Sequence, residues 1–249
     1  MRKTVSIVYF SPTGGTKQSV EAMAAAIGDA AAVYDVTVDA HPAPQQFGPD
    51  DFVIFGMPVY GSRIPKAAAA RIQGFTGDRT PCIVAAVYGN VRMGDALLEL
   101  ADFAKAQGFI VKGGAALVAR HTFGEIQVNR PDAADLAADR EFAIQAAAAP
   151  AGKPLELPGN RPYKDGGNGG GFRPQTTDSC TACGLCVRSC PMQAIAADCK
   201  TLSDACISCF RCIRVCPVGA KAMADGEYLS WAANFSESFK EPRQNAYYL

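Results

Sequence analysis

A pattern of cysteines that occurs twice restricts this chain more than any other feature of its sequence. Of the ten cysteines in 249 residues, nine lie between Cys180 and Cys216. The run Cys180-x-x-Cys183-x-x-Cys186-x-x-x-Cys190-Pro191 recurs as Cys206-x-x-Cys209-x-x-Cys212-x-x-x-Cys216-Pro217, with the same spacing at every position. A segment so short and so rich in cysteine cannot form an ordinary apolar core, so we expect it to fold around bound metal.

The spacing within each run favours iron–sulfur clusters over other uses of cysteine. Three thiolates at i, i+3 and i+6 let a tight loop fold around one inorganic cube, and in runs of this type the fourth cysteine ligates the other cluster. Zinc sites usually show paired Cys-x-x-Cys units, often with histidine, and a reducing compartment does not keep disulfides. We therefore expect two 4Fe-4S clusters. The first set of ligands is Cys180, Cys183, Cys186 and Cys216, and the second set is Cys206, Cys209, Cys212 and Cys190.

The segment from about Thr177 to Asp225 resembles the bacterial two-cluster ferredoxins, with every ligand position filled. That resemblance implies the transfer of single electrons at low potential. Two cysteines stay outside the ligand sets, because Cys199 has neither spacing and Cys82 lies in an apolar run, and we expect both to be structural. Basic residues near the runs could face an acidic partner or only solvent: Arg188, Arg211, Arg214 and Lys221.

The first part of the chain alternates short apolar runs with helical patterns. Five runs suit strands buried on both faces: Val5 to Phe10, Val33 to Val38, Phe52 to Phe55, Cys82 to Tyr88 and Ala115 to Ala119. Helical stripes lie between them at Val20, Met23, Ala24 and Ile27 and at Leu97, Leu100, Ala101 and Ala104, and an alanine-rich helix follows at about 132–149. This alternation predicts an α/β doubly wound parallel sheet with strand order 2-1-3-4-5.

Three loops at strand ends indicate a ligand site in this domain. The first strand runs through Ser11-Pro12-Thr13-Gly14-Gly15-Thr16 into a helix, and hydroxyls and amides at a helix N-terminus can hold a phosphate. An ordinary N-cap with a turn is the alternative for this loop. The patterns of nucleotide triphosphatases and dinucleotide folds are absent from it, so a terminal monophosphate fits better. The loops after the third and fourth strands lie near the switch point of such a sheet, where ligands bind.

Together these loops resemble those of a flavodoxin, from about Thr4 to Ala149, and the implied ligand is FMN. By that resemblance, phosphate contacts fall to Ser11, Thr13, Gly14, Gly15 and Thr16, and ring contacts to Pro58, Val59, Tyr60, Gly61, Tyr88, Gly89 and Asn90. Which tyrosine stacks on the ring is open, and either one can be a plain loop aromatic. His121, after the fifth strand, could reach the flavin edge or cap a turn. A receiver domain, which has the same strand order, would need an aspartate at the end of the third strand. This chain has Gly56 and Met57 there, which argues against a receiver domain.

Composition divides the chain into a flavodoxin-like domain (1–149), a linker (150–175), a small α+β ferredoxin domain (176–225) and a C-terminal tail (226–249). Residues 150–174 hold five prolines and seven glycines. Their glycines mimic a dinucleotide fingerprint, but neither a strand nor a helix flanks them. The aromatic tail is expected to dock on the first domain, with partner contact as the alternative. This order resembles the flavodoxin–ferredoxin fusion proteins of anaerobic bacteria and archaea.

The combination predicts an electron relay between two clusters, FMN and an external redox protein, such as a ferredoxin or an oxidoreductase. The alternatives are an FMN-dependent reductase of a small molecule such as a quinone, and a redox sensor. Twenty-four basic and twenty-four acidic residues give no net charge, which argues against nucleic acid. No apolar run approaches a membrane span, and a cytoplasmic protein is expected. The oligomeric state stays open, with a homodimer among the alternatives.

Overall fold

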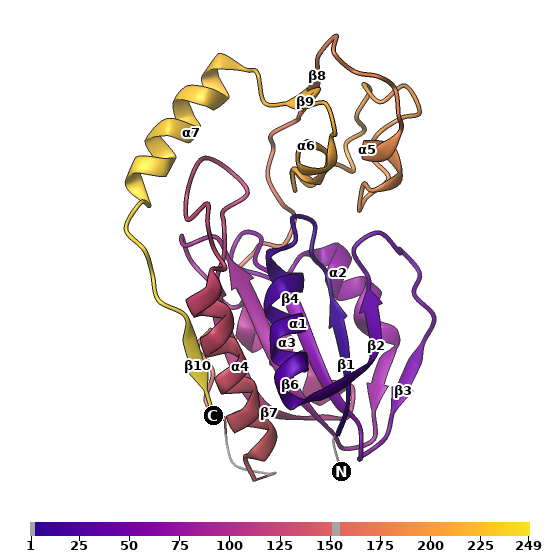
Figure 1. The fold of residues 1–249 in the computed structure, drawn as a ribbon, viewed down its shortest axis with the longest axis vertical. Helices are drawn as coiled ribbons and strands as arrows, with labels where there is room; N and C mark the ends of the chain where they lie inside the picture. The colour runs from indigo at the N-terminus through magenta and orange to yellow at the C-terminus, as the bar shows by residue number, and fades with distance from the viewer. Residues whose placement is uncertain (1–2, 151–154) are drawn as a thin grey trace.

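The computed structural model describes residues 3–150 and 155–249. An α/β domain forms one end of the molecule and the cysteine-rich domain lies over one edge of its sheet (Figure 1). That edge is the carboxyl end of the parallel strands, where open α/β sheets bind their ligands. Within the described ranges, no helix has the length and apolar character needed to cross a membrane.

The central sheet has the order β10-β7-β6-β4-β1-β2. Its strands are β1 (Lys3–Tyr9), β2 (Gly28–Asp35), β4 (Phe52–Pro58), β6 (Thr80–Tyr88), β7 (Phe109–Val118) and β10 (Ala246–Tyr248). The first five pair in parallel, so in chain order they read 2-1-3-4-5, as the sequence predicts. The second strand begins and ends earlier than Val33 to Val38, and β10 adds an antiparallel edge that the sequence did not indicate.

Helices cover both faces of this sheet and bury two apolar cores. On one face α1 (Gly15–Ile27) packs beside α4 (Ala133–Ala148), and Val20, Met23 and Phe142 fill the space beneath them. The other face carries α2 (Lys66–Arg71), the short 3-10 helix η1 (Ile72–Gly74) and α3 (Ala96–Ala106). In addition, β3 (Gln45–Phe47) pairs in parallel with β5 (Phe75–Gly77) in a separate two-stranded sheet. The α/β domain is therefore held by its own cores.

The cysteine-rich domain repeats its backbone as it repeats its sequence. Its regular elements are short: β8 (Gln175–Thr176), paired antiparallel with β9 (Lys221–Ala222), α5 (Leu185–Arg188) and α6 (Arg211–Val215). Positive φ angles recur at matched positions: 53° at both Ala182 and Ser208, 72° and 56° at Gly184 and Phe210, and 50° and 64° at Gln193 and Gly219. The members of each pair hold the same place relative to the cysteines of their run, so the two runs form equivalent loops.

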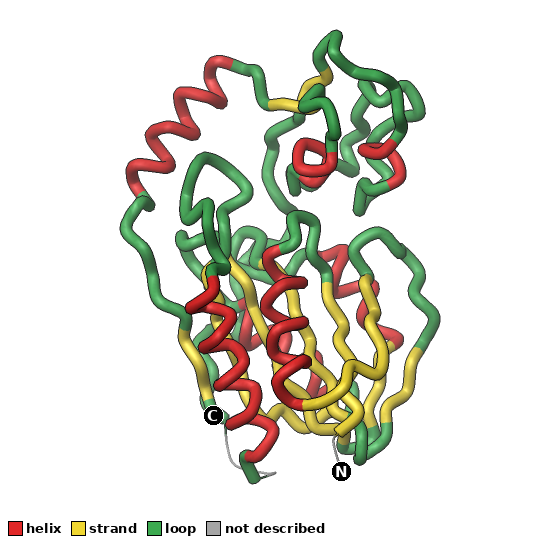
Figure 2. Tube along the Cα trace, in the orientation of Figure 1, coloured by secondary structure: helices red, strands yellow, loops and turns green. Residues whose placement is uncertain are grey.

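After the cysteine-rich domain the chain returns to the α/β domain. The helix α7 (Gly226–Ser238) stands beside the two domains and leads down to β10 at the sheet edge (Figures 1 and 2). Residues of α7 pack with aromatic side chains from three other segments in what we call the aromatic cap: Phe123, Phe172, Phe210, Tyr228, Trp231, Phe235 and Phe239. The tail thus docks on the first domain and also closes the side of the domain interface.

Residues 155–174 join the two domains, and we call this segment the strap. Hydrogen bonds at several points along it connect the strap to the α/β domain. The carboxylate of Asp95, fully buried at the start of α3, accepts from Asn160 N at 2.9 Å and from Lys164 N at 2.8 Å. Farther on, Gly167 N donates to Tyr60 O at 2.8 Å. Its glycine and proline content predicts a loose tether, but these contacts fix it to the α/β domain.

We predict that Asp95→Asn releases the strap. Hydrogen bonds from Lys164 and Asn160 hold the pKa of Asp95 below its usual range, despite its burial. The stabilisation is therefore present above the unfolded pKa, about 4, and is lost as pH falls through the folded value. At neutral pH the variant should lose about 1–3 kcal/mol, the cost of an imperfectly paired buried acceptor. Urea midpoints and proteolysis of 155–174 measure this, with exposed Asp78→Asn as the control; equal behaviour of both variants would contradict it.

Candidate functional site

The first set of cysteines lies around one small cavity of the cysteine-rich domain. Its members come from both repeats, because Cys180, Cys183 and Cys186 belong to the first run and Cys216 ends the second. The fifth cysteine of this cavity is Cys199, which is buried. The structure thus brings together the set that the spacing proposes, with Cys199 beside it.

The second set lies around a neighbouring cavity. Cys206, Cys209 and Cys212 meet Cys190 of the first run there, with Ile195, Leu202 and Phe210 among the apolar residues of the lining. Each cavity therefore takes three cysteines from one run and one from the other. This crossing joins the two repeats into a single unit.

Backbone amides point at the sulfur atoms in the same way in both repeats. Ala194 N donates to Cys190 Sγ at 3.3 Å, and Ala220 N, at the matching position, donates to Cys216 Sγ at 3.2 Å. Such donors stabilise sulfur that carries negative charge. The ammonium of Lys221 is buried beside the first set, and among the described residues it has no hydrogen-bond partner. Donors aimed at sulfur and an unpaired buried cation fit anionic iron–sulfur clusters.

The two sets face different surroundings. Cys183 of the first set is exposed, and Val218, in the same cavity lining, is 47% exposed. The second set faces the α/β domain instead. Burial, and then the charges of Cys209 and Cys206, raise the pKa of Tyr60, which lies in the loop after β4. The second set is consequently the inner one and the first set the outer one.

Arginines hold the cysteine-rich domain in this orientation. Arg211 Nη1, next to the second set, donates to Pro12 O at 2.8 Å, in the loop after β1. From the other side, Arg71 Nη2 donates to Pro191 O. Of the four basic residues noted in the sequence, Arg188 and Arg214 are exposed, whereas Arg211 and Lys221 are turned inward. The side chains of Arg211 and Lys221 are therefore largely withdrawn from solvent.

The loop after β1 has the form of an anion site, although its members differ in role. Gly14 has a φ of 94°, which favours glycine, and α1 begins directly after it. Ser11 is buried; its hydroxyl oxygen accepts from Lys17 N at 3.1 Å, and its amide donates to Thr37 Oγ1 at 2.8 Å. Thr16 is buried as well, while Thr13 is exposed. Ser11 shapes the loop, and Thr13 with the first amides of α1 faces outward.

A cavity of about 210 Å³ opens at this helix end. Its lining combines Thr13, Gly15 and Gln18 with Arg120, His121, Arg130 and Arg214, besides Ala119 and Val128. Arg120 pairs with exposed Glu125, but its Nε is buried without a partner among the described residues. Partial burial and the charge of Arg120 lower the pKa of Arg214. Two neighbouring guanidinium groups and a helix N-terminus fit a bound phosphate. Neither Arg120 nor Arg214 stood among the expected site residues, because they come close only through the domain contact.

The two loops expected near the flavin ring are brought together at the domain interface. Tyr88 is buried in the core of the α/β domain, whereas Tyr60 lies at the interface. Pro58 ends β4, and Val59 N donates to Val87 O at 2.9 Å. Gly61 lies against the strap at Gly166 and Gly167. Of the two tyrosines, Tyr60 is the one placed between the loops and the second set.

Gly89 and Asn90 meet other parts of this chain. A Cβ on Gly89 would lie 2.3 Å from the ring of His121, so only glycine lets the loop after β7 close here. The Nδ1 atom of His121 accepts from Phe123 N at 2.9 Å, which caps a turn. Asn90 is buried and its side chain binds the tail: Nδ2 donates to Phe239 O at 2.8 Å and Glu241 O at 2.9 Å, and Oδ1 accepts from Arg243 N at 2.7 Å. The contacts of Gly89 and of the Asn90 side chain are therefore made within this chain.

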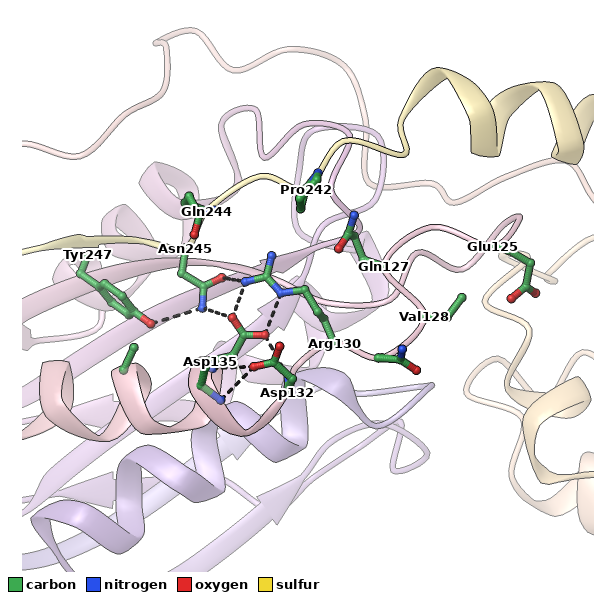
Figure 3. A pocket seen from close by; sticks show the side chains of 13 residues that line it. Glu125, Gln127, Val128, Arg130, Asp132, Asp135, Pro242, Gln244, Asn245 and Tyr247 are labelled. Atoms are coloured by element: carbon green, nitrogen blue, oxygen red, sulfur yellow. Dashed lines mark hydrogen bonds and ion pairs between the residues drawn. The ribbon is translucent and has the colours of Figure 1, made fainter.

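A larger cleft, of about 660 Å³, lies between the start of α4, the loop after β7 and the tail (Figure 3). Its polar groups bond one another. Arg130 Nε donates to Asp135 Oδ2 at 2.7 Å, Arg130 Nη1 to Arg243 O at 2.7 Å, and Val118 N to Asn245 Oδ1 at 2.8 Å. The residues of this cleft hold the tail in place, and the expected site residues lie elsewhere.

Comparison with known proteins supports the assignment of the cysteine-rich domain. Residues 175–196 and 206–220 each match a family described as a 4Fe-4S binding domain. This part of the chain is a 4Fe-4S ferredoxin-type domain. A search of curated proteins finds no match.

Solved structures similar to the first part share little sequence with it. The flavodiiron core of Flv1 from Synechocystis sp. PCC6803 is 17% identical with a TM-score of 0.42; the match covers 59% of this chain and 35% of that one, so this chain spans about a third of that protein. A flavodoxin from the domain Archaea is 14% identical (58% and 96% covered, TM-score 0.38). Megasphaera elsdenii flavodoxin in its two-electron reduced form is 20% identical (59% and 100% covered, TM-score 0.39). The strand order found here carries the flavodoxin-like assignment.

We predict that Asn90→Gly loosens the tail. Asn90 has a φ of 63°, which glycine adopts without strain, so this change removes only the side chain and its three hydrogen bonds. At about 1 kcal/mol per bond, local opening of the tail should become roughly 100-fold more frequent. Hydrogen exchange of 239–248 measures it, and exposed Asn129→Gly is the control. Unchanged exchange would show that the tail is held without the side chain of Asn90.

Proposed function

We propose that this chain, which joins a flavodoxin-like α/β domain to a 4Fe-4S ferredoxin-type domain, relays electrons between an external redox partner, two 4Fe-4S clusters and FMN. The observation that supports the proposal best is the placement of the cysteines. The second set borders Tyr60 at the mouth of the α/β domain, and Cys183 of the first set is exposed at the outside. The two sets lie in a row between solvent and the expected flavin loops.

When bound, the clusters supply one-electron exchange and the flavin accepts one or two electrons. The cysteines of the two sets would hold the clusters by their thiolates, with Ala194 N and Ala220 N donating to sulfur. Thr13 and the first turn of α1 would hold the FMN phosphate, assisted by Arg120 and Arg214. Tyr60, Gly89 and Asn90 would border the ring. Arg211 keeps the domains in contact through Pro12 O, which would hold cofactors bound in the two domains at a constant separation.

The outer face of the first set is the proposed entry point for the redox partner, a ferredoxin or an oxidoreductase. Cys183, Pro217, Val218 and Gly219 are exposed there, with Arg188 at the side. An uncharged patch with a cation beside it suits brief contact with an acidic electron carrier. The inner set is less exposed, because Cys190, Cys209 and Cys212 are buried and Cys206 is partly buried.

One further observation favours the alternative function, reduction of a small molecule. A cavity of about 420 Å³ lies between the domains and α7. Apolar side chains such as Phe210, Met223 and Tyr228 line it together with Arg120 and Arg214. To separate the functions, the reduced protein is offered quinones or an oxidised ferredoxin. Rapid multiple turnover of a quinone alone would favour the reductase; electron delivery to ferredoxin alone supports the relay.

The composition of the purified protein is the first test. Under anaerobic purification we expect about eight iron atoms, eight sulfides and one FMN per chain. EPR spectra of the dithionite-reduced protein should show two interacting 4Fe-4S clusters. Zinc in place of iron would overturn the cluster proposal, and iron without flavin would overturn the relay to FMN.

We predict that Cys209→Ser cuts the relay between its ends. Loss of one inner ligand should lower the iron content from about eight toward four per chain and leave the outer cluster reducible. Reduction of FMN by a reduced external ferredoxin should slow at least tenfold, as followed by stopped-flow absorbance. Cys82→Ser, in the α/β core, is the control and should keep all the iron. Flavin reduction at the wild-type rate after loss of the inner cluster would argue against the proposed order.

We predict that Arg120→Gln with Arg214→Gln weakens FMN binding. Each guanidinium at a phosphate is worth about 1.5–3 kcal/mol as a charge-assisted hydrogen bond, so the double variant should lose at least tenfold in affinity. Titration of the flavin-free protein with FMN, followed by flavin fluorescence, measures this. The iron content should not change. Exposed Arg188→Gln is the control; equal FMN affinity in both variants would place the phosphate elsewhere.

A further inference from the structure

Lys221 is a buried cation for which the described part of the chain supplies no hydrogen-bond partner. The residue is 3% exposed, and within the described ranges its Nζ has no hydrogen-bond partner. Removing an ammonium group from water without a partner is among the costliest single burials in a protein. Such a group keeps its charge in a fold only where something supplies negative charge beside it.

The fold itself does not require a lysine here. When the two repeats are aligned on their cysteines, the residue that matches Lys221 is Ile195. Ile195 is 5% exposed and forms an isolated bridge with Leu202, as Lys221 forms a ladder with Thr176. The same local structure thus accepts an apolar side chain in the first repeat. The lysine of the second repeat is therefore a difference between the repeats that the local fold does not require.

The position of Lys221 relates it to both sets of cysteines. Its side chain lines the cavity of the first set, next to Cys186 and Cys216. Lys221 lies in β9, and β9 packs against α6, the helix that carries Cys212 of the second set. The ammonium therefore lies beside the first set, on a strand that contacts a ligand-bearing helix of the second set.

We propose that Lys221 is a shared counter-ion of the two clusters and makes both easier to reduce. The inference rests on the proposed clusters. With its four thiolates an oxidised 4Fe-4S cluster carries a charge of about −2, and reduction adds one more negative charge. A fixed cation in a dry site stabilises the more negative state more strongly, which raises the reduction potential. Lys221 is thus a positioning residue for charge and is not a ligand.

An anion in the interdomain cavity is the competing partner for this ammonium. Lys221 also lines that cavity, beside Met223 and Tyr228. Its place in the cavity of the first set, and the packing of β9 against α6, favour the clusters. If an anion were the partner, removal of the lysine would leave both cluster potentials unchanged in a buffer without added organic anions.

The test is Lys221→Ile, which copies the first repeat, in the full-length holoprotein. Iron and sulfide analysis comes first, and EPR-monitored redox titration then gives the potential of each cluster. We expect wild-type iron content and a negative shift of both potentials, with at least a tenfold fall in the reduction equilibrium constant, which is about 59 mV for a one-electron couple. Exposed Lys200→Met is the control and should shift neither potential by a comparable amount.

The outcomes are separable. If wild-type protein contains no iron–sulfur cluster, the proposed function itself fails. If Lys221→Ile holds its iron and neither potential moves, or only one does, the shared counter-ion is refuted. Should Lys221→Ile assemble no clusters, Lys221→Arg decides: recovery of iron with the charge restored supports a counter-ion, and continued loss shows that only packing is at stake.

Discussion

The crossing of two cysteine sets is the constraint on which the rest of the structure depends. The described cysteine-rich domain has helices of only four and five residues and a ladder of two residue pairs, none of which is stable alone. Cysteines also make up much of its small core: Cys186, Cys190, Cys199 and Cys212. Cys190 and Cys216 each reach the other repeat's cavity, so ligation closes both loops at once. The ligands that would hold the cofactors also hold the domain.

A domain fixed in this way can act on the flavin loops only if it is also fixed relative to them. Three contacts do this from different sides: Arg211 with Pro12 O, Arg71 with Pro191 O, and the strap with Tyr60 O through Gly167. Electron transfer weakens steeply with distance, so a rigid interface matters more here than the high local concentration a loose tether would give. The strap and the tail both secure this interface, and neither contributes a cysteine.

The sequence allowed the sheet and the cysteine sets to be predicted because both follow from local patterns. Apolar runs specify buried parallel strands, and the strand order followed from alternation with helices. The strap was not predictable in the same way. Its attachment depends on Asp95, which in the sequence is one acidic residue before a helix, and on the amides of Asn160 and Lys164, which lie far along the chain. Asn90 is similar: the sequence suggests a ring contact, but its side chain binds the tail, at the opposite end of the chain.

The residues at which the two repeats differ distinguish an outer side of the cysteine-rich domain from an inner side. Their backbones match even in positive φ angles, so an isolated pair of such loops would place two equivalent clusters side by side. The surroundings remove the equivalence. Phe210, where the first repeat has Gly184, joins the aromatic cap next to the inner set, and Lys221 stands beside the outer set where the first repeat has Ile195. Cys183 meets solvent, while its counterpart Cys209 is buried against Tyr60. A symmetric ferredoxin fold thereby gains an outer and an inner end, and the proposed relay between an external partner and the second domain would use this asymmetry.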